Sequence, residues 1–394
     1  MSRSLSHNRI KTLDVVRGLT MTLVVFHHVR GATFDLYSSP SAISEIFVAL
    51  RMPMFFFISG FVASKAVDVW TAQYALKRML AKVRVEMVPT VVFFTLFVLL
   101  TTWEWTFPGG YWFTVALTAM LGLYYLVSAL SRSFFKHHRN TVLLTIGLLL
   151  YALMPSFEMA GIQAPDINKW FPAGKCSEFF IFFAIGVVCG GGKTRFLAML
   201  ERGSVSTAAL AISVAALSLS HLKKDLALPI PVVAVLTLLG SVALVVIVLS
   251  AFWRARGYWD SDGRMSRMMQ FVGRRTLDIY MIHWFLLPRI PSMKSLFWHR
   301  NNDILELLII GGLSIAIVAA CLLISAVIRT SPFFAKWLFA SSAVRKSSRK
   351  DADSVSVIAD SGIIEKADFP LPPVRRSRRD SVMETESVHW VGKQ

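Results

Sequence analysis

Charged side chains are scarce in this sequence, in which Asp, Glu, Lys and Arg together make up 17% of 394 residues. A soluble globular domain averages about 25% charged residues and interrupts its apolar runs with polar ones. Here hydrophobic residues reach 55% and the mean hydropathy is +0.56. The composition therefore excludes an ordinary soluble globular enzyme.

Cysteine is also rare, and no cleavable leader is recognisable. The three cysteines, Cys176, Cys189 and Cys321, lie within or at the edge of apolar segments. Their spacing fits neither a disulfide framework nor a metal site. Arg17 interrupts the first apolar run, and no clear cleavage site follows it. We expect no structural disulfide, no metal, and a first segment that stays in the mature protein.

The sequence is rich in apolar stretches of about 20 residues, the length that crosses about 30 Å of hydrocarbon. These stretches are continuously apolar rather than alternating, which favours helices over a barrel. The sequence therefore predicts an all-α, polytopic integral membrane protein with about ten transmembrane helices. The predicted spans are 13–32, 43–64, 86–104, 112–130, 141–156, 176–191, 204–221, 229–252, 276–296 and 303–328.

The net charge of +18 is distributed over the turns between these spans. If the N-terminus is cytoplasmic, Lys and Arg are concentrated in the N-terminal tail and the cytoplasmic turns, which is the bias of the positive-inside rule. An even number of spans then places both termini in the cytoplasm. The basic charge thus indicates a lipid bilayer as partner and argues against nucleic acid.

The composition changes near the end of the chain. From about residue 341 the sequence is polar, rich in Ser and poor in aromatic residues, as is typical of disorder. We therefore divide the chain into a transmembrane domain, 1–332, and a cytoplasmic, disordered basic tail, 333–394. Contact with anionic lipid headgroups or simple solvation would explain the basic runs of the tail. No catalytic role is expected there.

The first predicted span, LDVVRGLTMTLVVFHH (13–28), carries four ionisable side chains, Asp14, Arg17, His27 and His28. In a helix Arg17 and His28 are offset by only about 20° and separated by a rise of about 16 Å. They therefore share one stripe, with Arg17 in the cytoplasmic half of the bilayer and His28 in the outer half. Asp14 can pair with Arg17 on the same face.

Ionisable residues at such depths usually face a polar interior or a substrate path. Histidine, with an unperturbed pKa near 6.5, can accept a proton from an alcohol and return it. Arginine is a permanent cation suited to phosphate or carboxylate. This arrangement fits a thioester donor with a phosphorylated head and a long arm. The plainer alternatives are an interfacial Asp14–Arg17 ion pair and a hydrogen-bonded core histidine at His28.

Together with RMPMFFFISGFVAS (51–64), this span resembles the opening of the acyltransferase family 3 membrane proteins. These are mainly bacterial O-acyltransferases that modify cell-envelope sugars and other secreted acceptors. Family members share Arg or Lys, ten residues and then His in the first span, matched here by Arg17 and His28. A Phe-rich signature before Ile-Ser-Gly-Phe is matched by 56–61. RRTLDIYMIHWF (274–285) is similar to a third shared segment, with Thr276 in place of Ser.

The resemblance implies an inner-membrane enzyme that takes an acyl group, usually acetyl, from cytosolic acyl-CoA to a hydroxyl on the outer side. It implies that His28 is the catalytic residue and that Arg17 engages the donor, and we expect Asp14 to assist Arg17. Acyl-CoA is then a co-substrate, no cofactor is expected, and a carbohydrate or glycolipid is the expected acceptor. From the residues alone, a transporter with a buried Arg–His path or a non-catalytic scaffold would also fit.

The third predicted span departs from the family in its basic residues. The family commonly has Arg-x-x-Arg shortly before a proline at this place. KRMLAKVRVEMVP (77–89) lacks that spacing but keeps Arg78, Lys82 and Arg84. These side chains are candidates for binding the CoA phosphates. Positive-inside signalling explains them equally well.

Three more residues are candidates for acceptor binding or for support of the site. Arg51, near the outer end of the second span, either pairs with Glu45 or contacts the acceptor. Glu178, at the outer start of the sixth span, either hydrogen-bonds an acceptor sugar or borders the loop. His283, in the third family-like segment, either supports the catalytic centre or makes an ordinary contact between helices.

Overall fold

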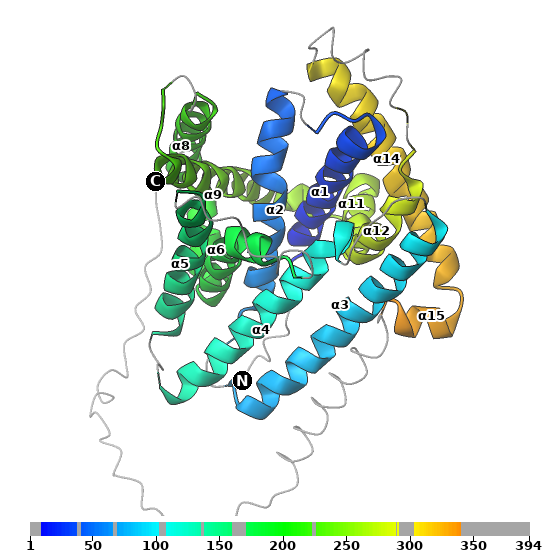
Figure 1. Cartoon of the computed structure of the whole chain (residues 1–394), viewed down its shortest axis with the longest axis horizontal. Helices are drawn as coiled ribbons and strands as arrows, with labels where there is room; N and C mark the ends of the chain where they lie inside the picture. The colour runs from blue at the N-terminus through cyan, green and yellow to red at the C-terminus, as the bar shows by residue number, and fades with distance from the viewer. Residues whose placement is uncertain are drawn as a thin grey trace, which may run out of the picture. The chain divides into compact units, whose positions relative to one another are not determined.

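The computed structural model describes residues 9–37, 41–65, 69–101, 108–134, 138–159, 171–222, 226–288, 290 and 303–339. Within these ranges the chain is helical and contains no strand. Figure 1 shows long helices packed side by side, with short helices at their ends. The predicted all-α architecture is confirmed.

Two sets of helices make up this part of the chain. The long ones are α1 (Lys11–His28), α2 (Ala42–Ala63), α3 (Ala72–Leu100), α4 (Trp112–Ser133), α5 (Arg139–Met159), α6 (Ala173–Gly191), α8 (Gly203–His221), α9 (Ile230–Arg254) and α14 (Asp303–Ile328). The short ones are η1 (Val29–Thr33), η3 (Gly109–Tyr111), α7 (Lys193–Glu201), α10 (Arg256–Trp259), α11 (Arg264–Arg274), α12 (Thr276–Ile282), η5 (His283–Leu286) and α15 (Pro332–Trp337).

Among the described helices, 8 are long and apolar enough to cross a membrane, namely α2, α3, α4, α5, α6, α8, α9 and α14. α1 is not in this set, because it has only 18 residues and three of them, Lys11, Asp14 and Arg17, are charged, whereas longer helices such as α3 also contain an uncharged apolar stretch. The segment 276–296, predicted as one span, is not one continuous helix in the structure. α12 ends at Ile282, and one 3₁₀ turn leads to an extended Leu287, as expected before Pro288.

α2 and α6 cross with their backbones in direct contact. A Cβ added at Gly60 would lie 2.0 Å from the carbonyl oxygen of Phe183, and one at Gly186 would lie 2.1 Å from that of Phe57. No side chain fits at either position. Lipid tails are as apolar as Leu, so helices associate in a bilayer through such close contacts between small residues. The glycine of the FISGF segment is thus a packing residue.

α1 lies in the middle of the helical domain, beside α2, α11 and α14 (Figure 1). It crosses α11 closely, because a Cβ at Gly273 would lie 1.7 Å from the carbonyl oxygen of Asp14. Beyond His28 the helix widens into the π-helical turn η1. π-helical turns are rare and occur often at functional sites. This turn carries the chain from α1 towards α2.

The predicted start of the tail, at residue 333, falls within a described helix. The first part of that range forms α15, whose Trp337 ring lies 4.7 Å from the guanidinium carbon of Arg84. Phe339 is buried, with the guanidinium carbon of Arg329 4.5 Å from its ring. These aromatic contacts extend the packed domain past the predicted boundary. The remainder of the predicted tail lies outside the described residues.

Candidate active site

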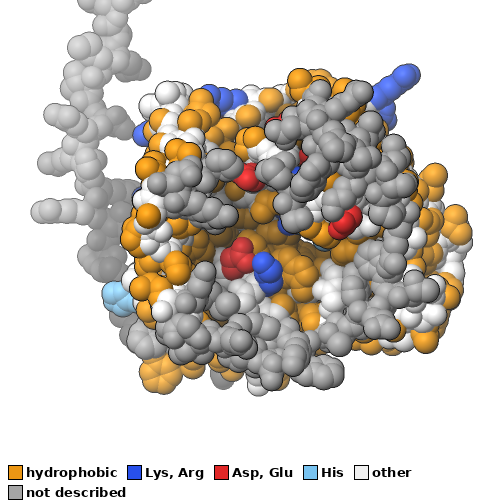
Figure 2. Space-filling view, turned by 45° about the horizontal axis from the view of Figure 1, so that its top comes forward, with side chains coloured by type: hydrophobic (Ala, Val, Ile, Leu, Met, Phe, Trp, Pro, Cys, Tyr) orange, Lys and Arg blue, Asp and Glu red, His pale blue; other side chains and the backbone are white. Residues whose placement is uncertain are grey.

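Two neighbouring cavities lie between α1, α2, α3 and α4. The first is an open cavity of about 900 Å³, to which α12 also contributes. The second, of about 790 Å³, shares five lining residues with the first: Arg17, Ser59, Lys82, Glu86 and Leu117. Figure 2 shows that the end of the bundle turned towards the viewer is hollowed, with hydrophobic walls and with acidic and basic side chains inside.

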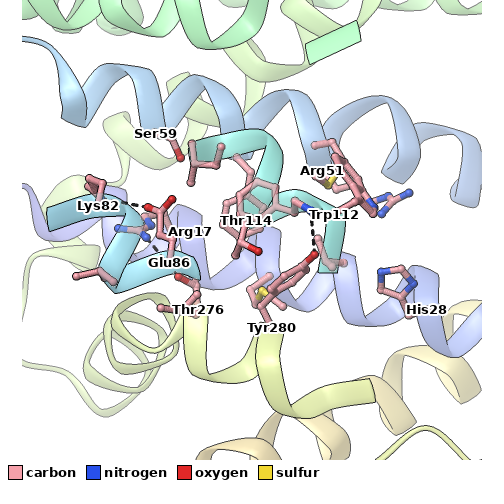
Figure 3. Close-up of a pocket in the computed structure, with 18 residues that line it drawn as sticks. Arg17, His28, Arg51, Ser59, Lys82, Glu86, Trp112, Thr114, Thr276 and Tyr280 are labelled. Atoms are coloured by element: carbon pink, nitrogen blue, oxygen red, sulfur yellow. Dashed lines mark hydrogen bonds and ion pairs between the residues drawn. The ribbon is translucent and has the colours of Figure 1, made fainter. Parts of the chain in front are cut away.

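Arg17 and His28 both line the first cavity, from one face of α1. Figure 3 shows them at its opposite ends. The Nη2 of Arg17 donates a hydrogen bond to the hydroxyl of Thr276, at 3.3 Å. The cavity therefore has a permanent cation at one end and an imidazole at the other.

Three aromatic side chains surround His28. The rings of Trp284 and His283 have their centroids 4.3 Å and 5.3 Å from that of His28. The phenol oxygen of Tyr37 lies 3.4 Å from Nδ1 of His28. The two ring contacts restrict the plane of the His28 imidazole, and the Tyr37 oxygen lies at its Nδ1.

His283 is completely buried. Its Nδ1 lies 3.1 Å from the carbonyl oxygen of Ile279, which can only accept, so Nδ1 carries the proton. Its Nε2 has no hydrogen-bonding partner among the described residues. His283 thus packs behind His28 as an oriented ring and does not line the cavity.

Tyr37 is placed over His28 by the turn η1. A Cβ added at Gly31 would lie 1.9 Å from Cε1 of Tyr37, so the phenol ring occupies the space of a missing side chain. Nε of Arg30 donates to a carboxylate oxygen of Glu306 on α14, at 2.7 Å, and Nη1 donates to the carbonyl of Leu36. An ion pair from a distant helix therefore anchors the loop that carries Tyr37.

Arg51 lines the same end of the first cavity as His28 (Figure 3). Its exposed fraction is 9%. Within the described part of the chain it forms no ion pair, and its Nε has no hydrogen-bonding partner. The predicted pair with Glu45 is absent there, because the two positions on α2 face in different directions.

The second cavity is lined by polar side chains of α3, spaced four residues apart. Nε of Arg78 donates to the hydroxyl of Tyr74 at 3.0 Å. Nζ of Lys82 lies 3.3 Å from a carboxylate oxygen of Glu86, and Thr118 donates to the other oxygen at 2.8 Å. The pair of Lys82 and Glu86 stands where the two cavities adjoin. The two cavities thus adjoin at Arg17, Lys82 and Glu86, with Arg78 in the wall of the second and His28 in the wall of the first.

A family model described as an acyltransferase domain matches residues 10–326. This range covers most of the chain and includes every residue that lines the two cavities. The chain belongs to acyltransferase family 3. Comparisons with curated proteins and with solved structures found no match. The protein is therefore a multi-pass membrane acyltransferase, and the two joined cavities are its candidate active site.

The structure separates two predicted donor-site residues from this family 3 site. Asp14 pairs with Arg9, whose Nε and Nη2 lie 2.7 Å and 2.9 Å from its two oxygens, and no direct pair with Arg17 occurs among the described residues. Arg84 points to α15 and lines neither cavity. It is two positions from Lys82, about 200° around the helix, so the two cannot line the same cavity.

Glu178 also lies away from the cavities. It forms a half-exposed ion pair with Lys175, at 2.8 Å, and lines neither cavity. Lys175 in turn lies 5.8 Å from the ring of Trp112, which does line the first cavity. Glu178 therefore reaches the first cavity only indirectly, through Lys175 and Trp112.

Sequence reasoning missed several lining residues. Glu86 continues the stripe of Arg78 and Lys82 at the next four-residue step, and this spacing was the signal that could have found it. Thr276 and Tyr280 are likewise four residues apart and both line the first cavity. No group of three or more metal-ligating side chains occurs among the described residues.

Proposed function

We propose that this membrane acyltransferase is an O-acyltransferase of the cytoplasmic membrane. It takes an acyl group, acetyl in the first instance, from acyl-CoA on the cytoplasmic side. It passes the group to a hydroxyl of an envelope carbohydrate or glycolipid on the other side. The observation that carries the proposal is that two adjoining cavities, which share Arg17 and Lys82 in their walls, hold Arg78 in the one and His28 in the other.

The cations of the two cavities suit the donor. Arg78 is exposed at one end, where CoA phosphates would arrive, and Lys82 and Arg17 follow along the walls. Hydrogen bonds from ionised donors to phosphate oxygens are short and strong. Nη2 of Arg17 donates a hydrogen bond to Thr276. Because a guanidinium carries five N–H groups, others remain for the acyl-CoA. A thin acyl-pantetheine arm then extends towards His28.

His28 performs the acid–base work in this proposal. The acceptor oxygen attacks the thioester carbonyl carbon while the imidazole removes the hydroxyl proton. The carbon–sulfur bond breaks, and the imidazolium returns the proton to the leaving thiolate. The products are an ester and free CoA, and His28 ends neutral. Because Tyr37 lies at Nδ1, Nε2 is the nitrogen left for the substrate.

An alternative mechanism at His28 uses two successive acyl transfers. The imidazole nitrogen attacks the thioester first, and the acyl-imidazole then gives its acyl group to the acceptor. Such a covalent intermediate produces ping-pong kinetics, with CoA released before the acceptor reacts. Direct transfer requires both substrates together. Initial rates measured over a grid of donor and acceptor concentrations separate the two mechanisms.

The test uses membrane vesicles of defined orientation that contain equal amounts of wild type, His28→Ala or His138→Ala. His138 is exposed and lines neither cavity, so its variant is the matched control. Radiolabelled acetyl-CoA is supplied to the cytoplasmic face, and label is followed into polysaccharide, glycolipid and secreted fractions. We expect transfer by wild type and His138→Ala, with a loss of at least about 100-fold in His28→Ala.

Transfer by His28→Ala at the wild-type rate would remove His28 from the mechanism. Label that enters only when acetyl-CoA is on the other face would reverse the proposed direction. If wild type transfers no label from acetyl-CoA or from longer acyl-CoAs, the donor assignment is wrong.

A further inference from the structure

Arg51 differs from Arg30 and Arg329, two other arginines of low exposure, in forming no ion pair within the described residues. The buried Arg139 also forms none there, but it donates to the carbonyl of Lys65 and to the side-chain oxygen of Asn140, whereas Nε of Arg51 has no hydrogen-bonding partner. Arg30 pairs with Glu306 at 2.7 Å, and Arg329 binds both oxygens of Asp278. Arg51 has a smaller exposed fraction than Arg329, yet forms no ion pair within the described residues. A buried charge is costly unless it is paired and hydrogen-bonded. Within the described residues, this cation of the cavity therefore has no ion-pair partner, and a bound ligand could provide one.

The position of Arg51 suits a ligand better than a structural role. Its side chain lies in the first cavity, at the end that holds His28 (Figure 3). Trp112 and Tyr280 line the cavity beside it. Aromatic rings next to a guanidinium provide an apolar face and a charged fork in one pocket. A sugar ring with an acidic substituent presents the matching pair of surfaces.

We infer that the acceptor carries a negatively charged group, a carboxylate or a phosphate, that pairs with Arg51 while its hydroxyl stands at His28. The inference rests on the proposed function, because it names the acceptor class of that site. A planar guanidinium matches both anions with two parallel hydrogen bonds. Arg51 could instead pair with the oxyanion that forms at the thioester carbonyl during acyl transfer. That charge is transient, so the Arg51 charge would have no partner before and after the reaction. A permanent anion compensates it for as long as the acceptor is bound.

Binding without acyl donor tests this directly. Purified full-length protein in detergent is titrated with glucose, glucuronate and glucose 6-phosphate, and tryptophan fluorescence reports binding. We expect at least one charged sugar to bind about tenfold or more tightly than glucose, the gain typical of a charge-assisted hydrogen bond. In Arg51→Met this preference disappears, while the affinity for glucose stays. The two charged sugars distinguish a carboxylate site from a phosphate site.

Two further variants keep the result specific. Lys193→Met removes an exposed cation that lines neither cavity, so it keeps the preference for the charged sugar. Arg51→Lys keeps the charge without the planar fork and retains part of the preference. Thermal unfolding of Arg51→Met is measured alongside, and we expect no loss of melting temperature, because the variant removes a buried unpaired charge.

The inference is overturned if wild type binds glucose as tightly as both charged sugars. It is also overturned if Arg51→Met keeps the preference, or if Lys193→Met loses it to the same extent. These outcomes do not depend on acyl transfer. If wild type transfers nothing from acyl-CoA, the proposed function fails while the binding result stands.

Discussion

At the scale of single residues, the proposed function requires Arg17 to bind both its own protein and the donor. Its Nη2 contacts Thr276, which stands where the family's segment has Ser. This contact directs the guanidinium from α1 towards α12, across the adjoining ends of the two cavities. Under the proposed function, a donor that extends from one cavity into the other would lie against it. The proposal therefore assigns Arg17 to the donor and not to the acceptor.

Removal of the Arg17 charge should weaken donor binding. In Arg17→Met we expect the KM for acyl-CoA to rise about tenfold or more, since hydrogen bonds to charged groups contribute about 1.5–3 kcal/mol. Initial rates at varied acyl-CoA concentration measure this effect. Arg84→Met is the matched control, because Arg84 faces α15 rather than either cavity. An unchanged KM in Arg17→Met, or an equal rise in Arg84→Met, would contradict this placement of the donor.

At the scale of elements, the turn η1 and the loop after it place Tyr37 against His28, the proposed catalytic residue. Gly31 leaves room for the Tyr37 ring, and Arg30 ties the turn to Glu306 on α14. Asp35 adopts a positive φ of 54°, a conformation that Asp tolerates better than most residues. These features turn the chain back so that Tyr37 reaches His28. The turn thus supports the candidate active site from outside, since it lines neither cavity.

Gly31→Ala should displace Tyr37, since the new methyl group would lie 1.9 Å from its ring. We expect kcat to fall about tenfold or more, because small errors in placing a catalytic group are costly, while the KM for acyl-CoA stays close to that of wild type. Gly311→Ala is the matched control, because a Cβ at Gly311 meets nothing within 4 Å. Steady-state kinetics of both variants test the idea, and a normal kcat in Gly31→Ala would refute it.

The crossing of α2 and α6 should limit stability. Gly60→Ala places a methyl group 2.0 Å from a backbone oxygen of α6, so the two helices must move apart. Overpacking of this kind costs about 1–3 kcal/mol. We expect a lower melting temperature in detergent for Gly60→Ala and no such loss for Gly191→Ala, where a Cβ meets nothing within 4 Å. Equal melting temperatures would mean that α2 and α6 are not held by this contact.

At the scale of the whole molecule, the two adjoining cavities have chemically different ends. Arg78 and Lys82 make one end basic, and His28 and Trp112 make the other end aromatic. A donor with several phosphates and an acceptor built of sugar rings would enter from opposite sides. The arrangement therefore requires that the two ends face opposite sides of the membrane.

Cysteine labelling in intact and inverted vesicles tests this orientation. The native cysteines, Cys176, Cys189 and Cys321, are first replaced by Ala. We expect a membrane-impermeant maleimide to modify Arg78→Cys from the cytoplasmic side and Tyr37→Cys from the other side, because both native positions are at least partly exposed. Modification of both variants from one side would contradict a route across the membrane.

The local sequence determined the features that depend on helix periodicity and composition. Apolar runs of membrane length predicted the all-helical architecture, because backbone groups in lipid must be paired within the segment. The separation of eleven residues between Arg17 and His28 placed them on one face of α1. The family motifs at both ends of the domain indicated the reaction. None of these conclusions needs a contact between residues far apart in the chain.

Only the tertiary structure decided which side chains meet across helices. In the structure Asp14 forms an ion pair with Arg9, and Arg84 contacts Trp337 of α15. Arg51 forms no ion pair within the described residues. α12 also ends at Ile282, so that the His283 ring packs against His28. Such contacts depend on how closely helices approach, and the approach is set at points such as the α2–α6 crossing, where glycines bring backbones from distant parts of the sequence into contact.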